Sequence, residues 1–110
     1  MVAADYGYVA PDWYRELHRY AERLGSVDAL RAACDRAGFS SAIVTTESVD
    51  VGLTDPALVV RYRLGMPQLR GFVDALSAVD RMALTADAIT AVRLAGERFT
   101  PEVVEVVARA

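Results

Sequence analysis

The first apolar pattern in the chain has the period of an α-helix. Large apolar side chains recur at spacings of four, three and four positions, with charged residues between them. This spacing places them on one face of a helix that begins at about Pro11 and ends at Gly25. The residues on this face are Trp13, Leu17, Tyr20 and Leu24. We therefore expect Trp13 to lie in a core.

A second helix is predicted directly after the first. Ser26 is a typical N-cap residue, and Gly38 can adopt the left-handed conformation that ends a helix. The apolar residues of this segment also share one face: Val27, Leu30, Cys34 and Ala37. Because Cys34 lies on this face, we expect it to be packed and chemically inert.

Two later segments have the pattern of β-strands. Residues 42–51 are rich in β-branched side chains and end in an alternation of apolar and polar positions. Residues 101–108 are apolar on both faces apart from Glu105, which is typical of a strand buried between two layers. We expect these two strands to pair with each other.

Three helices are predicted between the strands. Asp55 followed by Pro56 is typical of an N-cap and a first helical position, and Gly65 ends this helix. A second, short helix is predicted from about residue 67 to residue 76.

The third of these helices is the longest in the chain. Ser77 and Asp80 form a capping pair at its start, and Gly96 lies near its end. Its expected apolar face consists of Val79, Met82, Ala86 and Ile89.

Length and composition limit the classes of protein. A chain of 110 residues fits a single domain, and 54% hydrophobic residues is high for that size, so we expect some apolar surface to meet a partner. The net charge is -3 and the twelve basic residues, all arginine, alternate with acidic ones, which disfavours nucleic acid as a ligand. The sequence shows neither a leader pattern nor a membrane-spanning run, so we expect a cytoplasmic protein without a membrane partner.

Cysteine and histidine each occur once, as Cys34 and His18. One cysteine forms no disulfide within the chain, and this pair supplies no cluster of metal ligands, so we expect no metal site.

The residues after the first two helices resemble a known family. Ala37-Gly38-Phe39 ends a helix and leads into a β-branched strand, as happens near the carboxyl end of class I S-adenosylmethionine-dependent methyltransferases. The helix that opens with Asp55-Pro56 and carries Arg61-Tyr62-Arg63-Leu64, followed by an Ala- and Arg-rich helix and a Val-rich last strand, is similar to the small-molecule branch of that family. The resemblance covers about residues 12–110.

This resemblance implies an α/β fold, or α+β for the isolated chain: a partial Rossmann-like methyltransferase fold with an antiparallel strand pair and four to five helices. Residues 1–10 would be a candidate remnant of the family's fifth strand and its loop. Residues 11–51 would form two helices and the sixth strand, residues 52–97 a helical lid over the acceptor, and residues 98–110 the last strand.

One part of the family pattern is missing. The family binds the methyl donor with a glycine-rich turn, and the seven glycines here never fall within two residues of one another. The resemblance therefore implies that S-adenosylmethionine is bound only through a partner chain, and that this chain alone binds no cofactor. The last strand would also lack a neighbour, so we expect residues 102–108 to pair with a donor-binding subunit or with a second copy of this chain.

Six side chains are candidates for a site. His18 is the only side chain whose ordinary pKa suits proton transfer near neutrality, which makes it the candidate catalytic residue, although an exposed or packed helix histidine is the alternative. Arginine suits carboxylate recognition, and methionine and phenylalanine suit either an apolar pocket or a core. The candidate substrate-binding residues, in the regions of the resembled lid, are Tyr14, Tyr62, Arg63, Met66 and Phe72.

These observations lead to one main hypothesis for function and two alternatives. The chain is expected to be the acceptor-binding and lid subunit of a split small-molecule methyltransferase, inactive alone. The first alternative is a non-catalytic binding or dimerisation module derived from such an enzyme. The second is a repurposed small enzyme that uses the old acceptor pocket.

Overall fold

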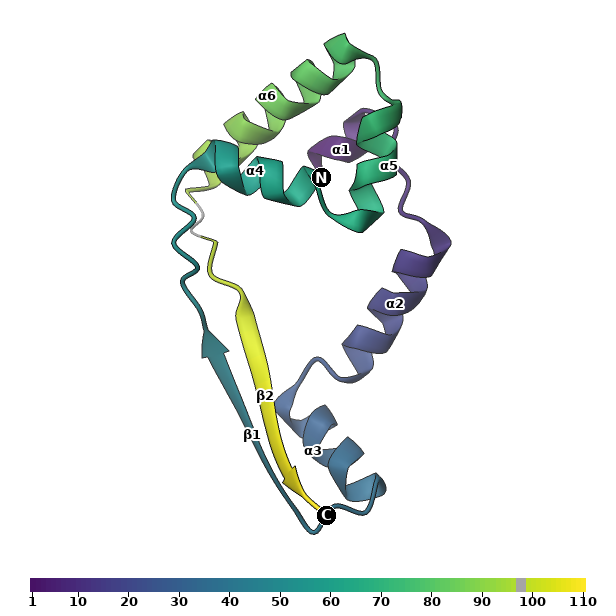
Figure 1. Ribbon diagram of the computed structural model, residues 1–110, viewed down its shortest axis with the longest axis vertical. Helices are drawn as coiled ribbons and strands as arrows, with labels where there is room; N and C mark the ends of the chain where they lie inside the picture. Colours follow the sequence, from purple (N-terminus) through teal and green to yellow (C-terminus); the bar gives the residue numbers. More distant parts are fainter. Residues whose placement is uncertain (97–98) are drawn as a thin grey trace. The chain divides into compact units, whose positions relative to one another are not determined.

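The computed structural model describes residues 1–96 and 99–110 (Figure 1). These residues form six helices and one two-stranded antiparallel sheet, which makes the fold α+β. The chain divides into two compact units where the sequence suggested one domain. The helical unit comprises Met1–Pro11 and Asp50–Phe99, and the sheet unit comprises Asp12–Val49 and Thr100–Ala110. The expected boundary between lid and last strand, at 97 and 98, lies outside the described residues.

The sheet unit begins with the two predicted helices, α2 (Asp12–Arg23) and α3 (Val27–Arg36). The backbone N–H of Ala29 donates a hydrogen bond of 3.1 Å to the Ser26 hydroxyl, as expected for an N-cap. Gly38 has a φ of +84°, so the left-handed turn that leads out of α3 uses the residue that adopts it without strain.

The two strands are β1 (Ser41–Ser48) and β2 (Glu102–Arg109), and their predicted pairing is confirmed. In the antiparallel register Ser41 lies opposite Arg109 and Ser48 lies opposite Glu102. The strand β1 ends three residues before the predicted end. Its continuation bends away because the N–H of Gly52 donates to the Asp50 carboxylate at 2.9 Å and Gly52 has a φ of +73°.

Helix α3 packs on one face of the sheet. Val44 points to this face and is buried, and its cross-strand neighbour Val106 points the same way because side chains alternate along a strand. The other face carries Ile43 and Val107, which remain 66% and 57% exposed. The strand β2 is therefore covered on one face only within the described residues, whereas its pattern predicted burial on both.

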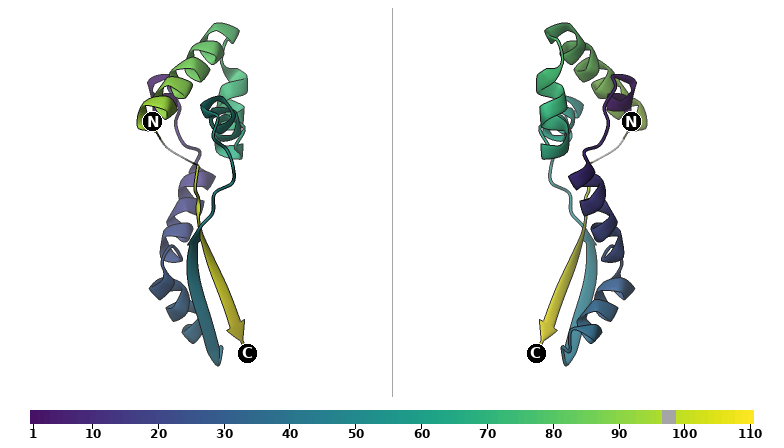
Figure 2. Two further views of the ribbon diagram at one scale, coloured as in Figure 1. Left: turned by 90° about the vertical axis from the view of Figure 1, so that its left-hand side faces the viewer. Right: turned by 90° about the vertical axis from the view of Figure 1, so that its right-hand side faces the viewer.

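The helical unit contains α1 (Val2–Asp5), α4 (Pro56–Leu64), α5 (Pro67–Ala75) and α6 (Ala78–Ala95). In Figure 2, α1 lies beside α6, and α4 and α5 lie on the other side of the unit. One cluster of its buried core consists of Ala3, Leu69, Val73 and Leu84, and Val59 and Val60 of α4 are buried as well. A short helix thus replaces the strand remnant that was suggested for residues 1–10.

The helix ends follow the predicted capping residues. The Asp55 carboxylate accepts from the Ala57 N–H at 2.9 Å, and the Ser77 hydroxyl accepts from the Asp80 N–H at 3.1 Å. Gly96, with a φ of +61°, ends α6. Local hydrogen bonding is sufficient to place these boundaries.

The buried face of α6 differs from the prediction. Leu84 is fully buried, whereas Val79 and Met82, on the predicted face, are exposed. Helix α6 carries apolar residues on more than one face, so periodicity alone does not decide which face is covered. The helices packed against it, α1 and α4, make that choice.

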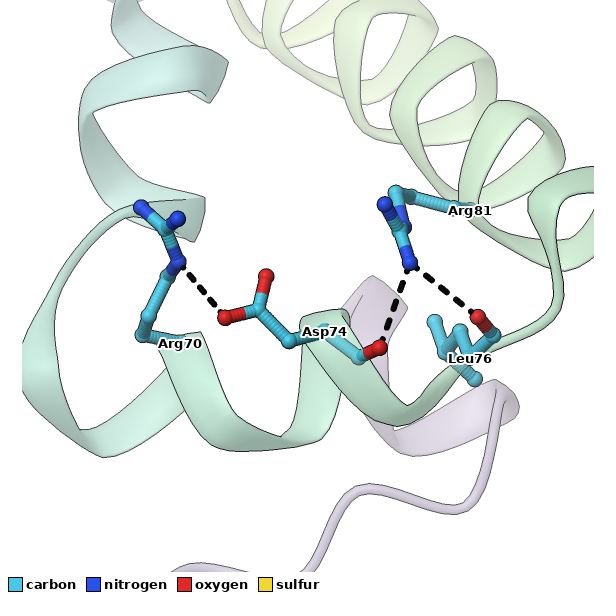
Figure 3. A network of polar contacts seen from close by, with 4 residues as sticks. All are labelled: Arg70, Asp74, Leu76 and Arg81. Carbon is cyan, nitrogen blue, oxygen red and sulfur yellow. Dashed lines mark hydrogen bonds and ion pairs between the residues drawn. The ribbon is translucent and has the colours of Figure 1, made fainter.

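Arg81 joins α6 to the end of α5 (Figure 3). Its Nη2 donates to the backbone carbonyls of Asp74 and Leu76, each at 3.2 Å, while the Asp74 carboxylate accepts from Arg70 at 2.9 Å. The last carbonyls of a helix have no partner within the helix, and a cation there also interacts favourably with the helix dipole. Arg81 therefore fixes the α5–α6 junction.

Candidate functional site

The helical unit holds an apolar pocket of about 280 Å³. Its lining comes from the start of the chain, α4, α5 and α6, and includes Val60, Leu64, Leu69, Leu84 and Val92. Pockets that hold small molecules are mostly apolar and measure roughly 300 to 1,000 Å³. At about 280 Å³ the pocket lies just below this range, which suits a compact apolar ligand.

Small side chains on α6 leave this space open. Ala88, Ala91 and Ala95 all line the pocket, at spacings of three and four residues, which places them on one face of the helix. Leucine or phenylalanine at these positions would extend toward α4 and fill the gap. This alanine face was not singled out in the sequence, although its spacing is visible there.

Arg63 is the one charged side chain among the described residues that line the pocket. Its guanidinium carbon lies 5.8 Å from the centroid of the Phe99 ring, within the range of a cation–π interaction. The Tyr62 ring also contacts Phe99, at 5.5 Å between centroids. Phe99 thus holds this part of α4, and Arg63 places a positive charge beside an apolar space.

The other candidates in the helical unit do not line the pocket. Tyr62 is half exposed and faces Phe99. Met66 is the residue before α5, and its sulfur lies 3.7 Å from the Gln68 amide nitrogen. Phe72 packs against the core and meets the Tyr8 ring edge-on at 5.4 Å. Of the four candidates in this unit, the structure brings only Arg63 to the pocket.

Tyr14 and His18 belong to the sheet unit and form a cluster of their own on α2. Their ring centroids are 5.8 Å apart, and the Trp13 and Tyr14 ring centroids are separated by the same distance. The Nδ1 atom of His18 lies 3.7 Å from a carboxylate oxygen of Glu22. His18 itself is exposed, as is the residue it pairs with.

The apolar face of α2 is open to solvent. Its large residues Trp13, Leu17 and Tyr20, together with Leu24 directly after the helix, are between 47% and 57% exposed. The prediction that Trp13 lies in a core is therefore wrong for the described structure. The periodicity was correct, but nothing in the described residues of the sheet unit covers this face, and contiguous exposed apolar residues are typical of interaction surfaces.

One further polar contact was not visible in the sequence. Tyr6 donates a hydrogen bond to the Asp87 carboxylate, and this bond raises the pKa of Tyr6 to about 12. The hydrogen bond between them holds the segment after α1 against α6. The two residues are 81 positions apart, and no local pattern links them.

Residues 1–96 and 99–110, which the structure describes, contain neither a cluster of metal ligands nor a membrane-spanning helix. Within them no group of three or more His, Cys, Asp or Glu side chains could hold a metal ion. None of the helices there is both long and apolar enough to cross a membrane.

Comparisons of the chain with family models, with curated proteins and with solved structures give no match. Function is therefore inferred from the residues of the chain and their geometry.

Proposed function

We propose that this chain is the acceptor-binding and lid subunit of a split S-adenosylmethionine-dependent small-molecule methyltransferase, and that a partner chain binds the methyl donor. The observation that carries this proposal is the apolar pocket lined mainly by α4, α5 and α6. These are the helices whose sequence resembles the acceptor lid of the family.

The chemistry of methyl transfer suits a subunit without catalytic side chains. The donor's sulfonium group is already activated, so the protein mainly holds the acceptor in line with the methyl group and excludes water. An apolar pocket can do both. Arg63 lies at its edge, and the planar guanidinium of arginine suits recognition of a carboxylate or another anionic oxygen.

The pocket does not fit the donor itself. S-adenosylmethionine carries a positive sulfonium, and the described lining contains an arginine and neither a glycine turn nor an acidic residue. A glycine-free lining keeps the backbone from the close approach that a nucleotide cradle needs. Donor binding is accordingly assigned to the partner.

The exposed face of α2 supports the need for a partner. Four large apolar side chains along this helix are partly exposed to water. Covering them with a partner would stabilise the complex by about 25 cal/mol for each Å² of apolar area removed from water. We propose that the donor-binding chain covers this face.

The experiment begins with capture of partners from the native host on the tagged chain, followed by a donor-binding assay on each protein retained. We expect a retained protein that binds S-adenosylmethionine. Capture of no donor-binding protein would contradict the proposal, and a stable self-associated chain without such a protein would favour the non-catalytic module.

A pair of variants tests the pocket in the captured complex. Ala88→Phe places a ring in the pocket, whereas Ala86→Phe adds the same ring on an exposed position of the same helix. We expect Ala88→Phe to reduce methyl transfer by at least tenfold and Ala86→Phe to leave it close to that of the parent. Equal activity of the two variants would show that the pocket does not hold the acceptor.

A further inference from the structure

The hydrogen-bonding pattern of the sheet shows which backbone N–H and C=O groups of β2 do not bond to β1. Val49 N–H donates to the Pro101 carbonyl at 2.9 Å, and this pair continues the register in which Ser41 lies opposite Arg109. Bonded and non-bonded pairs alternate along an antiparallel ladder. Odd-numbered residues of β2 therefore bond to β1. The even-numbered residues direct their N–H and C=O groups to the outer edge: Glu102, Val104, Val106 and Ala108.

This edge has few of the features that prevent edge pairing. The strand β2 contains no proline and no lysine, and most of its side chains are apolar. Within the sheet unit, α3 packs mainly on β1 and contacts β2 less. A two-stranded sheet is also marginal in water unless further strands or helices are added.

The charges on β2 are self-complementary in one register. Glu105 and Arg109 lie four positions apart, so they share a face with Val107 midway between them. Two copies of β2 can pair antiparallel so that Val107 of one copy lies opposite Val107 of the other. In this register, which we call the register about Val107, Glu105 of each copy lies opposite Arg109 of the other. In the register about Val106, Glu105 lies opposite Val107 and has no charged partner. In the register about Glu105, the two Glu105 carboxylates lie opposite each other, which is unfavourable.

The same register agrees with the hydrogen-bonding pattern. It sets Val106 opposite Ala108 of the second copy, and both residues have outward N–H and C=O groups. Val107 then faces Val107 in a non-bonded pair, where the Cα atoms approach to about 4.5 Å and side chains are closest. The exposed Ile43 lies opposite Val107 on its own sheet, so the row through Val107 continues as four apolar side chains across four strands.

We propose that β2 pairs with β2 of a second copy of this chain, antiparallel about Val107, to form a continuous four-stranded sheet. The interface is isologous, since each copy contributes the same residues. This inference goes beyond the proposed function. In the resembled family, the strand next to β2 would belong to the donor-binding half, whereas here it belongs to a second copy of the same chain. Self-pairing leaves the apolar face of α2 for the donor-binding chain.

The first experiment measures the mass of the purified full chain by sedimentation velocity over a range of concentrations. We expect a concentration-dependent dimer. Val106→Pro removes an N–H that points to the outer edge and leaves the hydrogen bonds to β1 in place. We therefore expect this variant to be a monomer with unchanged circular dichroism. Val106→Ala keeps the N–H and is expected to keep the dimer. Glu105→Pro removes an N–H that bonds β1, and we expect it to reduce the strand signal itself.

The second experiment reverses single charges. Glu105→Arg places arginines opposite each other in both pairs, and Arg109→Glu places glutamates opposite each other, so each variant alone is expected to dimerise on the order of thirtyfold more weakly. An equal mixture of the two variants restores both complementary pairs and is expected to give a mixed dimer. The double variant Glu105→Arg/Arg109→Glu should likewise regain self-association.

Three outcomes would overturn the inference. The first is a parent chain that stays monomeric at about 100 µM, far above the Kd of a specific dimer. The second is a dimer that Val106→Pro and both charge reversals leave unchanged. The third is that the parent chain does not self-associate but binds a donor-binding protein, and that the Val106→Pro variant no longer binds this protein. Failure to capture any donor-binding protein would count against the proposed function alone.

Discussion

The hydroxyl of Tyr6 donates a hydrogen bond of 2.5 Å to the carboxylate of Asp87, in the middle of α6. Together with the burial of Ala3 against Leu69 and Leu84, this bond makes the first residues of the chain part of the helical unit. Those residues also line the pocket, so the contact between Tyr6 and Asp87 helps to shape the candidate site.

This bond makes part of the stability depend on pH. The pKa of tyrosine is raised from 10.0 to about 12 in the folded chain, so between those values the unfolded chain has lost a proton that the folded chain retains. Stability from this source is fully present below pH 10 and is lost as pH rises to about 12. We expect Tyr6→Phe to be less stable than the parent at pH 8, with the difference shrinking between pH 10 and 12 in denaturant titrations. A difference that stays constant over this range would contradict the assignment.

The cap of α6 allows a direct measurement of local stability. Ser77→Ala removes the hydroxyl that accepts from the Asp80 N–H, and loss of such a cap costs about 1 kcal/mol. The expected change is a fall of several degrees in the melting temperature. Thr90→Ala is the matched control, because the Thr90 hydroxyl donates to the Ala86 carbonyl on an exposed part of the same helix, and its loss should have little effect. Equal losses for both variants would show that the cap has no special role.

The capping residues also show how far the sequence predicted the fold. Helix ends at Asp55, Ser77 and Gly96 were located correctly because they depend on hydrogen bonds and backbone angles within a few residues. The strand pairing followed from two apolar segments with few other partners. The buried face of α6 was wrong because several faces of that helix are apolar, and only packing against α1 and α4 selects one.

The candidate site was less predictable than the fold for a similar reason. Arg63 could be named from its residue type, but the pocket depends on alanines of α6 that leave a gap opposite α4. The sequence shows the alanines and not the distance between helices. The assignment of Trp13 to a core failed because an apolar helix face indicates burial without indicating whether the covering surface belongs to the same chain.

The apolar face of α2 is predicted to be an interface and not a source of stability. Leu17→Gln combined with Tyr20→Gln changes side chains that are already more than half exposed, so we expect the free energy of unfolding to change by less than about 1 kcal/mol. The same variant should lose the donor-binding partner in capture experiments. Arg19→Gln, on the charged face of the helix, is the control and should retain the partner. Retention of the partner by the double variant would place its binding surface elsewhere.

The central claim is that this chain supplies the acceptor site while another chain supplies the donor. The most direct measurement is transfer of a radiolabelled methyl group from S-adenosylmethionine to small molecules of a host extract, with the captured partner alone, this chain alone and the two combined. The account predicts transfer to a small-molecule product only when both chains are present, and loss of that product with Ala88→Phe. Full transfer by the partner alone, or transfer by this chain alone, would contradict the account.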